Sequence, residues 1–349
     1  MLQFKISDGT LSVHPTDATT DNGLAAPGVW LGDLSKGVST VAYAGDVQGR
    51  VWSFSLSTSN SSGTKLYTAK DKDGKVQPIT AGMLVGKDPD PAAQGNLWVF
   101  FGTGQYLNSS DLTNTSTQSW YGLIVSSTIK FKGNNIAVTP TSDRISALVQ
   151  RSIIAETPGT AEALNADGSV KTSAIAPARA VTALPDPSDM AGKSGWYIDL
   201  LSPTSTTASD GTVAYTANQV VEGERIVTPN QFQGNRLLAT TRIPQAVDLC
   251  NPSGRGWIMA VDPFTGTNPK LSFFDLNGDG MINQPADYVM VDGKPVATSG
   301  IGFSSLPNNP IFMGGTMLVS FDNGSASSIK TSGTSNTLQR VSWREMIAQ

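Results

Sequence analysis

The stretch GWIMAVDPFTG, from Gly256 to Gly266, decides the fold that we expect for this chain. Its first half is a short apolar run that begins with tryptophan, and such runs between turn residues are typical of buried strands. Its second half reads Asp-Pro-x-Thr-Gly, in which Asp262 can accept hydrogen bonds from its own downstream backbone and Gly266 supplies a positive φ. The stretch therefore predicts a buried strand that ends in a tight turn.

Comparable units occur along the chain. Residues 41–56 place a glycine turn between two short strands, and Trp52, Phe54 and Leu56 alternate along one face of the second strand. This pattern predicts a hairpin with that face buried. Residues 97–104 form a near-continuous apolar run, which favours a strand buried on both faces. Further strands with aromatic or apolar anchors are expected at 120–125, 195–200, 236–241 and 316–321.

The repeated order of strand, glycine-rich turn and aromatic-bearing strand, with hardly any helical periodicity, predicts an all-β fold. Such units suit the blades of a β-propeller, which close a ring and leave only short edges. The repeats are too irregular to count blades, and a β-sandwich of comparable strands is the alternative. We expect a single domain over residues 1–349, with long loops between blades and an irregular excursion at about 141–195.

The segment DLNGDGMIN, from Asp275 to Asn283, is the one place where residue types and spacing together imply a specific chemistry. Asp275, Asn277 and Asp279 carry side-chain oxygens at alternate positions, which match positions 1, 3 and 5 of an EF-hand-type calcium loop. Gly280 occupies position 6, where such a loop turns sharply. The segment therefore predicts a calcium site, and an Asx-rich turn without a metal is the alternative.

The second half of this loop departs from the EF-hand pattern. Met281, at position 7, would contribute its backbone oxygen, and Asn283 stands at position 9. Position 12 is Ala286, and the next carboxylate, Asp287, follows at position 13. Either a bulge around Pro285 lets Asp287 complete the cage or a water does, so we expect modest, extracellular-range affinity. No long helix flanks the loop, which predicts a calcium loop between strands.

Composition narrows the function classes. Charged residues make up 15% of the 349 residues, against about 25% in average soluble proteins, which suits a secreted or surface-exposed β-rich protein. The net charge is −4 without a basic patch, which argues against nucleic-acid binding. With one histidine, His14, and one cysteine, Cys250, the chain has no internal disulfide and no zinc or copper site rich in these residues.

Four smaller expectations concern single residues, apolar runs and the chain's opening. We interpret His14 as a solvated side chain, and Cys250 as a buried apolar residue or a free thiol. No apolar run reaches transmembrane length. The opening segment 1–5 has neither a charged n-region nor an apolar h-region, so export would require a longer precursor.

The order of the motifs resembles that of the PilY/PilC-type tip adhesins and biogenesis factors of type IV pili. The resemblance covers roughly residues 40–346, and its motifs are collinear with those of the family. They stand at 43–52, 101–107, 195–200, 223–227, 256–262, 275–283 and 342–345.

The resemblance implies the C-terminal β-propeller of a pilus-tip protein, with about seven blades in the family. The earliest propeller signatures of the family are missing here, so we expect an incomplete or modified ring. In the family the propeller carries a calcium site linked to pilus extension and retraction. By this resemblance, the site on this sequence consists of Asp275, Asn277, Asp279, the Met281 carbonyl and Asn283. At the position of Asn283 the family often has aspartate.

The resemblance implies a function without catalytic activity. It implies a protein exported through the periplasm to the cell surface, associated with the pilus tip or the outer membrane. Its expected partners are minor pilins, the pilus assembly machinery and a host or abiotic surface. Such proteins promote pilus assembly, oppose retraction, mediate adhesion and contribute to twitching motility and virulence.

Two alternatives remain beside this hypothesis. A quinone-dependent dehydrogenase-like propeller would share the Asp-x-x-Thr-Gly type of turn, but the chain lacks a catalytic base in a polar cluster and has no adjacent cysteine pair. A dockerin-like partner module is disfavoured because its loop would be duplicated and flanked by helices. The carboxylates in segment 222–225 are expected to form an ion pair between strands.

Overall fold

The computed structural model describes the chain except for residues 18–21, 34–37, 94, 126–127, 132–133, 138–142, 166, 168, 184–188, 246–252 and 333–349. Cys250 and the motif at 342–345 therefore lie outside the described residues. The fold is mostly β, with 49% strand and 4% helix, which confirms the predicted class.

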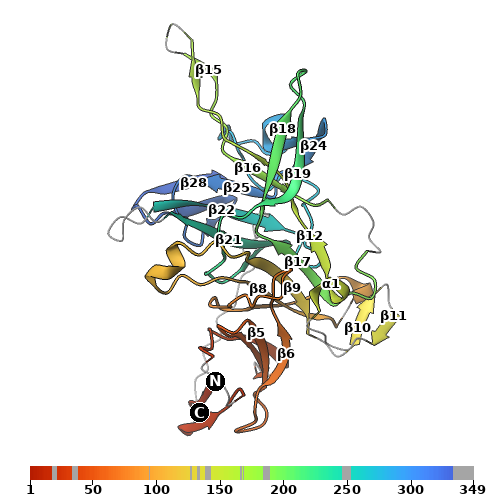
Figure 1. Cartoon of the computed structure of the whole chain (residues 1–349). Helices are drawn as coiled ribbons and strands as arrows, with labels where there is room; N and C mark the ends of the chain where they lie inside the picture. Colours follow the sequence, from red (N-terminus) through yellow and green to blue (C-terminus); the bar gives the residue numbers. More distant parts are fainter. Residues whose placement is uncertain are drawn as a thin grey trace, which may run out of the picture.

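Four sheets of three or more strands succeed one another in the described part of the chain (Figure 1). The first contains β3 (Gly28–Asp33), β4 (Val38–Gly45), β5 (Arg50–Ser55) and β6 (Thr64–Thr68). The second contains β12 (Val149–Arg151), β17 (Gly195–Asp199), β9 (Ser119–Ile124), β8 (Leu97–Gly102) and β7 (Leu84–Lys87). The third contains β13 (Ile153–Thr157), β16 (Ala178–Val181), β25 (Gly300–Phe303), β22 (Ser253–Val261), β21 (Arg236–Gln245) and β20 (Gln231–Gln233). The fourth contains β26 (Ile311–Met313), β27 (Thr316–Ser320) and β28 (Ala326–Lys330).

Two-stranded hairpins and short helices complete the described elements. The hairpins are β1 (Leu2–Lys5) with β2 (Thr10–Val13), β10 (Thr128–Phe131) with β11 (Asn134–Ala137), β14 (Ala163–Leu164) with β15 (Val170–Thr172), β18 (Ser202–Thr207) with β19 (Val213–Val220), and β23 (Tyr288–Val291) with β24 (Lys294–Ala297). The helices are α1 (Arg144–Ala147) and the 3₁₀ turns η1 (Pro91–Ala93), η2 (Ser109–Leu112) and η3 (Pro285–Asp287).

The sheets stack face to face because their central strands are apolar on both sides. In β8, Trp98 and Phe100 belong to one buried cluster, and Val99 and Phe101 belong to another. Successive side chains of a strand point to opposite faces, so the second sheet lies between two apolar layers. The predicted strand buried on both faces is thereby confirmed.

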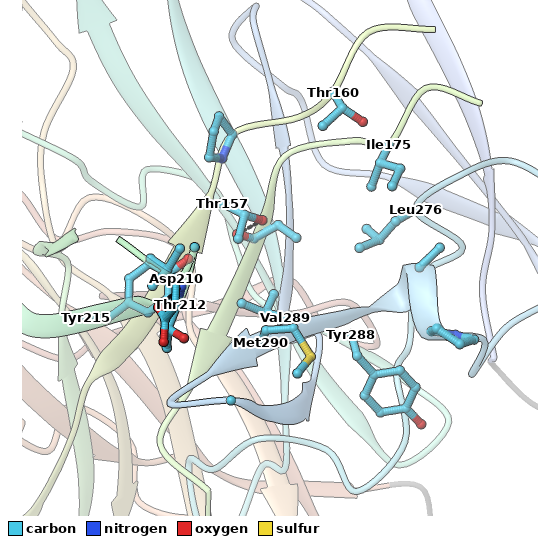
Figure 2. A pocket seen from close by; sticks show the side chains of 17 residues that line it. Thr157, Thr160, Ile175, Asp210, Thr212, Tyr215, Leu276, Tyr288, Val289 and Met290 are labelled. Carbon is cyan, nitrogen blue, oxygen red and sulfur yellow. Dashed lines mark hydrogen bonds between the residues drawn. The ribbon is translucent and has the colours of Figure 1, made fainter. Parts of the chain in front are cut away.

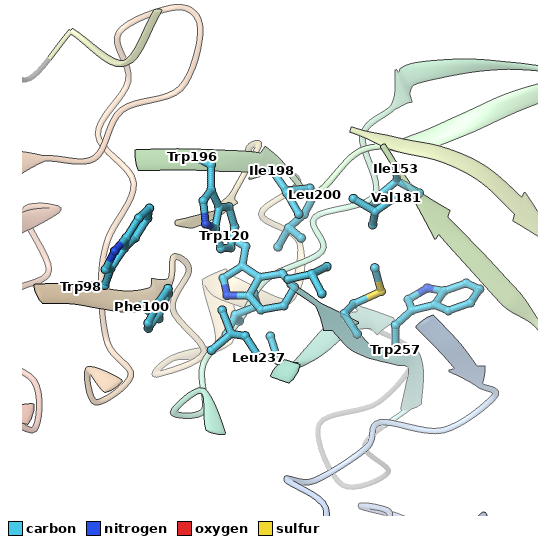
Figure 3. Close-up of a cluster of buried hydrophobic side chains, with 14 of the residues drawn as sticks. Trp98, Phe100, Trp120, Ile153, Val181, Trp196, Ile198, Leu200, Leu237 and Trp257 are labelled. Carbon is cyan, nitrogen blue, oxygen red and sulfur yellow. The ribbon is translucent and has the colours of Figure 1, made fainter. Parts of the chain in front are cut away.

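The layer between the second and third sheets is rich in tryptophan (Figure 3). Trp120 and Trp196 meet edge to face, with ring centroids 5.6 Å apart, a favoured geometry for aromatic pairs. Trp257 contributes from the third sheet. This layer ties the second sheet to the third.

The layer beyond the third sheet positions the predicted cation loop. Ile258 and Ala260 of β22 face it, opposite Met317 and Val319 of β27. Phe273 and the residue after it belong to the same buried cluster. The chain therefore leaves the core immediately before the loop begins.

This succession of face-to-face sheets is the arrangement of propeller blades. No sheet closes on itself among the described strands. The number of blades and the single-domain boundary 1–349 stay predictions.

Residues 141–195, expected as an excursion, take several roles in their described parts. β12 pairs with β17 in parallel, and β13 and β16 form the outer part of the third sheet. The hairpin β14–β15 projects from the body of the molecule in Figure 1. The segment thus links the second sheet to the third.

Two local expectations need correction. The hairpin of β4 and β5 is confirmed, but Val51 is buried together with Trp52 and Phe54 because it packs in the layer toward the second sheet. His14 is fully buried, so the prediction of a solvated side chain was wrong. Its ring nitrogens lie 3.0 Å from the Ser61 carbonyl oxygen and 2.9 Å from Gln3 Oε1.

The turn after β22 confirms the prediction made from the sequence. Asp262 Oδ1 accepts hydrogen bonds from the N–H groups of Phe264 and Thr265, each at 3.0 Å. Gly266 has φ +67°, and a Cβ there would lie 2.4 Å from the Trp196 ring. Aspartate and glycine are therefore both required for the turn to pack on the tryptophan layer.

Replacing Asp262 by alanine is expected to lower the free energy of unfolding by about 1–2 kcal/mol, because the turn loses the acceptor of two backbone donors. Urea unfolding monitored by tryptophan fluorescence measures this change. Asp210→Ala, at an exposed hairpin turn, is the control and should cost less. An Asp262→Ala protein as stable as the parent would contradict the assigned role.

Candidate functional site

The candidate site is the loop that leads from β22 to β23. Phe273 and Phe274 anchor its start, with their rings edge to face at 5.0 Å. The N–H of Asp275 donates to the Lys330 carbonyl oxygen of β28 at 3.0 Å. The loop ends in η3, directly before β23. Both ends are thus fixed by the core, and the segment between them lies at the surface.

Asp275 organises the first turn of the loop. Its side chain is only 4% exposed, and Oδ1 accepts the Gly278 N–H at 2.7 Å while Oδ2 accepts the Gly280 N–H at 2.9 Å. Both glycines have positive φ, +70° and +81°. The chain therefore wraps around this carboxylate, and Gly280 makes the sharp turn that its position predicted.

Asn277 and Asp279 face each other across the exposed side of the turn. Asn277 Nδ2 donates to Asp279 Oδ2 at 3.0 Å. Asp279 Oδ1 accepts the Met281 N–H at 2.8 Å. The Met281 side chain is 56% exposed, so this residue contributes its backbone to the loop and no packing to the core.

The end of the loop is held by Asp287, whose structural role the sequence did not predict. Asp287 is fully buried, and its two carboxylate oxygens accept the N–H groups of Leu276 and Gln284, each at 3.0 Å. These donors flank the loop on either side, so Asp287 braces its two ends. Asn283 has φ +68° and its Oδ1 accepts the Tyr288 hydroxyl at 3.3 Å.

The donor set of the loop fits a hard cation. An ionised carboxylate has about four lone-pair positions, so Asp275 and Asp279 each keep free positions after their two hydrogen bonds. Oxygen-only ligands suit calcium or magnesium rather than zinc or copper. Among the described residues, no three His, Cys, Asp or Glu side chains gather in a metal-binding group. A cation here would thus depend on amide and backbone oxygens as well as carboxylates.

A hollow of about 600 Å³ lies beside the loop. The loop from Asp275 to Gly280 forms one side, and residues 174–176 and the end of β28 form the others. The exposed face of the candidate site is therefore accessible to an ion from solvent.

The carboxylates of segment 222–225 take part in ion pairs. Glu224 accepts Arg179 Nη1 at 2.7 Å, and Glu222 pairs with Arg255. The expected ion pairing is confirmed, but both carboxylates lie in the connection between β19 and β20 and reach strands β16 and β22 from there. These carboxylates are thereby engaged in the packing of the third sheet.

Comparison with known proteins assigns the chain to a family. Residues 11–157 match the family model described as the PilY1 beta-propeller domain. The chain is 35% identical over 348 residues to a type IV pilus biogenesis factor PilY1 homolog of Xylella fastidiosa, over 99% of this chain and 24% of that relative. The chain belongs to the PilY1 β-propeller family. The predicted family resemblance is thus confirmed.

Other PilY1 proteins agree with this assignment. The type IV pilus biogenesis factor PilY1 of Pseudomonas aeruginosa is 27% identical over 318 residues, which cover 80% of this chain and 24% of the relative. The crystal structure of the P. aeruginosa PilY1 C-terminal domain matches with a TM-score of 0.64 and 22% identity, over 95% of this chain and 66% of that chain. This structural match shows the shared fold. The chain spans about a quarter of the length of these curated PilY1 relatives.

None of the helices in the described part of this PilY1-family chain has the length and apolarity to cross a bilayer.

Proposed function

We propose that this chain is the calcium-binding β-propeller of a type IV pilus tip-associated protein that promotes pilus assembly, opposes retraction and mediates adhesion to surfaces or host cells. Its partners are minor pilins and the assembly machinery, and its location is the pilus tip or outer membrane after export through the periplasm. The observation that supports this proposal is the turn of Gly278 and Gly280 around the Asp275 carboxylate, in a chain of the PilY1 family.

Bound calcium would supply two positive charges against the carboxylates of Asp275 and Asp279. Asn277, the Met281 carbonyl and Asn283 would complete most of the oxygen set. Asp287 is fully buried, holds Leu276 and Gln284, and does not line the hollow that Asp275 and Asp279 line. We therefore infer that it acts on the cation through the shape of the loop and that water supplies the last ligand.

Calorimetric titration of the intact chain with calcium should show one saturable site, with a Kd in the micromolar-to-millimolar range typical of sensor and extracellular loops. The Asp275→Ala/Asp279→Ala double variant removes the carboxylates at positions 1 and 5 of the loop and should lose the site. Calcium should raise the Tm of the parent and leave the Tm of the double variant unchanged. A ligand at about 100 times its Kd stabilises the folded state by about 2.7 kcal/mol.

Asp71→Ala/Asp73→Ala is the matched control. Asp71 and Asp73 are also spaced by two residues before a glycine, and they lie in an exposed turn where Asp71 accepts the Asp73 N–H at 2.9 Å. This control should titrate like the parent. Equal heats in the parent and in the Asp275→Ala/Asp279→Ala variant would remove the calcium site from the proposal.

The pilus role is tested in cells that carry the same variants in the full-length protein. We expect the Asp275→Ala/Asp279→Ala cells to lose twitching motility or pilus display, and the Asp71→Ala/Asp73→Ala cells to keep both. Unchanged motility and display in the loop variant would contradict a pilus function of the loop. We also expect no quinone-dependent dye reduction by the purified chain.

A further inference from the structure

A second hollow, of about 530 Å³, lies beside the exit of the loop (Figure 2). It is enclosed by the end of β13, the turn between β18 and β19, and strand β23. We call it the β23 groove. Its wall is mainly apolar, with Ile175, Tyr215, Leu276 and Val289 among its lining side chains. Its volume is within the usual range of ligand sites, roughly 300–1,000 Å³.

The groove runs along an open strand edge. β23 pairs only with β24 in the described part of the chain. The groove is lined by Tyr288, Val289 and Met290 in succession. Consecutive side chains of a strand point to opposite faces, so a cavity that touches three in a row meets the edge of the strand.

The register shows which backbone groups this edge presents. Val291 pairs with Lys294 across the two-residue turn at 292–293, whose residues both have positive φ, so this is the hydrogen-bonded pair that closes the hairpin. Met290 then faces Pro295 in a non-hydrogen-bonded pair. The N–H and C=O groups of Tyr288 and Met290 therefore point away from β24. The Tyr288 N–H donates to the Pro285 carbonyl oxygen of η3, whereas no described residue bonds to the Tyr288 C=O or to the N–H and C=O of Met290.

The charge of the groove indicates the kind of residue that fits its rim. Among the described residues that line it, Asp210 is the only charged one. Its Oδ1 accepts the Thr212 N–H at 2.9 Å, and the hydrogen bonds from Thr212 lower the pKa of Asp210 below its ordinary value. The rim is thus anionic at neutral pH, and a cationic side chain complements it.

We propose that the β23 groove binds an extended peptide segment that adds as a strand to β23, inserts alternate apolar side chains into the groove and places a lysine or arginine at Asp210. Strand addition supplies backbone hydrogen bonds for affinity and side-chain pockets for specificity. The Tyr288 C=O and the N–H and C=O of Met290 are the backbone partners, and the apolar wall accepts every second side chain.

The groove and the cation loop share residues. Ile175 and Leu276 line both hollows, and the Leu276 N–H is held by Asp287. Pro285 and Ala286, from the exit of the loop, also line the groove. Resting on the calcium site proposed above, we infer that calcium tightens peptide binding, because ordering the loop fixes one wall of the groove, and linkage makes this coupling reciprocal.

The test uses two fluorescent capped hexapeptides, Lys-Val-Thr-Val-Thr-Val and Val-Thr-Val-Thr-Val-Lys, which place the cation at either end of a strand. Fluorescence anisotropy with the intact chain in calcium should show saturable binding of at least one of them, in the range of tens to hundreds of micromolar. The same peptide with glutamate in place of lysine should bind at least about threefold more weakly. EDTA should weaken binding of the lysine peptide about fivefold or more.

Two variants test the geometry. Met290→Pro removes one outward N–H without touching a ladder bond and should weaken binding about tenfold. Asp210→Asn should weaken binding of the lysine peptide about two- to fivefold and reduce its preference over the glutamate peptide. Asp167→Asn is the matched control, because Asp167 Oδ1 likewise accepts the N–H of the second residue after it, Ser169, at 2.9 Å, and it lies outside the groove lining.

The outcomes separate the groove from the calcium site. No saturable binding of either lysine peptide below about 1 mM, or equal binding by Met290→Pro, would overturn the strand-addition proposal whatever the calcium titration shows. If Met290→Pro fails to fold, equal binding by the surface variant Asp210→Asn would overturn it. Peptide binding without any calcium heat would leave the groove standing and remove the calcium site. Equal affinity in calcium and EDTA, with a normal calcium titration, would overturn the coupling alone.

Discussion

Replacing Arg179 by leucine is expected to lower the free energy of unfolding by about 3–5 kcal/mol, the usual cost of removing one partner from a buried ion pair. Arg179 lies in β16, and its side chain is fully buried. Its guanidinium donates to Glu156 Oε2 at 2.8 Å and to Glu224 Oε1 at 2.7 Å. It also lies 4.0 Å from the centre of the Trp257 ring.

The cost comes mainly from the carboxylate that would remain. Burial alone would lower the pKa of Arg179, but the carboxylates of Glu224 and Glu156 raise it above its ordinary value, so the guanidinium stays charged. Glu224 is 1% exposed, and its Oε2 has no hydrogen-bond partner among the residues that the structure describes. Without Arg179, this buried carboxylate would have to lose its charge or bring water into the core.

Urea unfolding of Arg179→Leu, Glu224→Leu and the double variant measures this pair. The double variant should be more stable than Arg179→Leu, because it removes the isolated charge, and the two single effects should not add. Arg179→Lys should be intermediate, since one ammonium group cannot reproduce the three directed bonds of the guanidinium to Glu156, Glu224 and the Ser202 hydroxyl. A loss below about 1 kcal/mol for Arg179→Leu would show that Glu224 finds another partner.

The parts of the fold that the sequence predicted are those set by local rules. The turn at Asp262 follows from the hydrogen bonds that aspartate makes to its own neighbours, and the burial of β8 follows from its continuous apolar run. Pairings between distant segments carry no local signal. The parallel pairing of β12 with β17 and the pairing of β16 with β25 are of this kind.

The burial of His14 could not be predicted for the same reason. A histidine in a polar segment is expected in solvent unless distant groups satisfy its ring nitrogens. Here the Ser61 carbonyl, far along the chain, supplies one of those partners. The polarity of the segment around His14 therefore gave a wrong prediction, because a contact with a residue distant in the sequence determines its burial.

In the candidate site, too, the local features could be predicted from the sequence and the long-range contacts could not. The wrap of Gly278 and Gly280 around Asp275 follows from residue spacing, and the structure shows it. The role of Asp287 does not follow from spacing. Counting positions makes it a late ligand, whereas its distance from the Leu276 and Gln284 N–H groups makes it the brace of the loop. The open edge of β23 likewise could not be predicted, because it depends on β23 having no second strand paired with it in the described part of the chain.

Replacing Asp287 by alanine is expected to lower the free energy of unfolding in EDTA by about 2–6 kcal/mol, because two backbone donors lose their acceptor at about 1–3 kcal/mol each. The two donors are the N–H groups of Leu276 and Gln284. Asp287→Asn should be intermediate, since its amide has one oxygen to accept with and directs its NH₂ group at the second donor. Urea unfolding in EDTA measures the series.

This measurement separates a brace from a ligand, because EDTA removes any contribution of a bound cation. A residue that acted only as a calcium ligand would leave stability in EDTA nearly unchanged and would lose calcium affinity alone. Asp279→Ala, in the exposed part of the loop, is the control for that behaviour. As a brace, Asp287 should affect both quantities, since the loop whose ends it joins must keep its shape before Asp275 can meet an ion. Equal stability of Asp287→Ala and the parent in EDTA would return Asp287 to the role of a ligand.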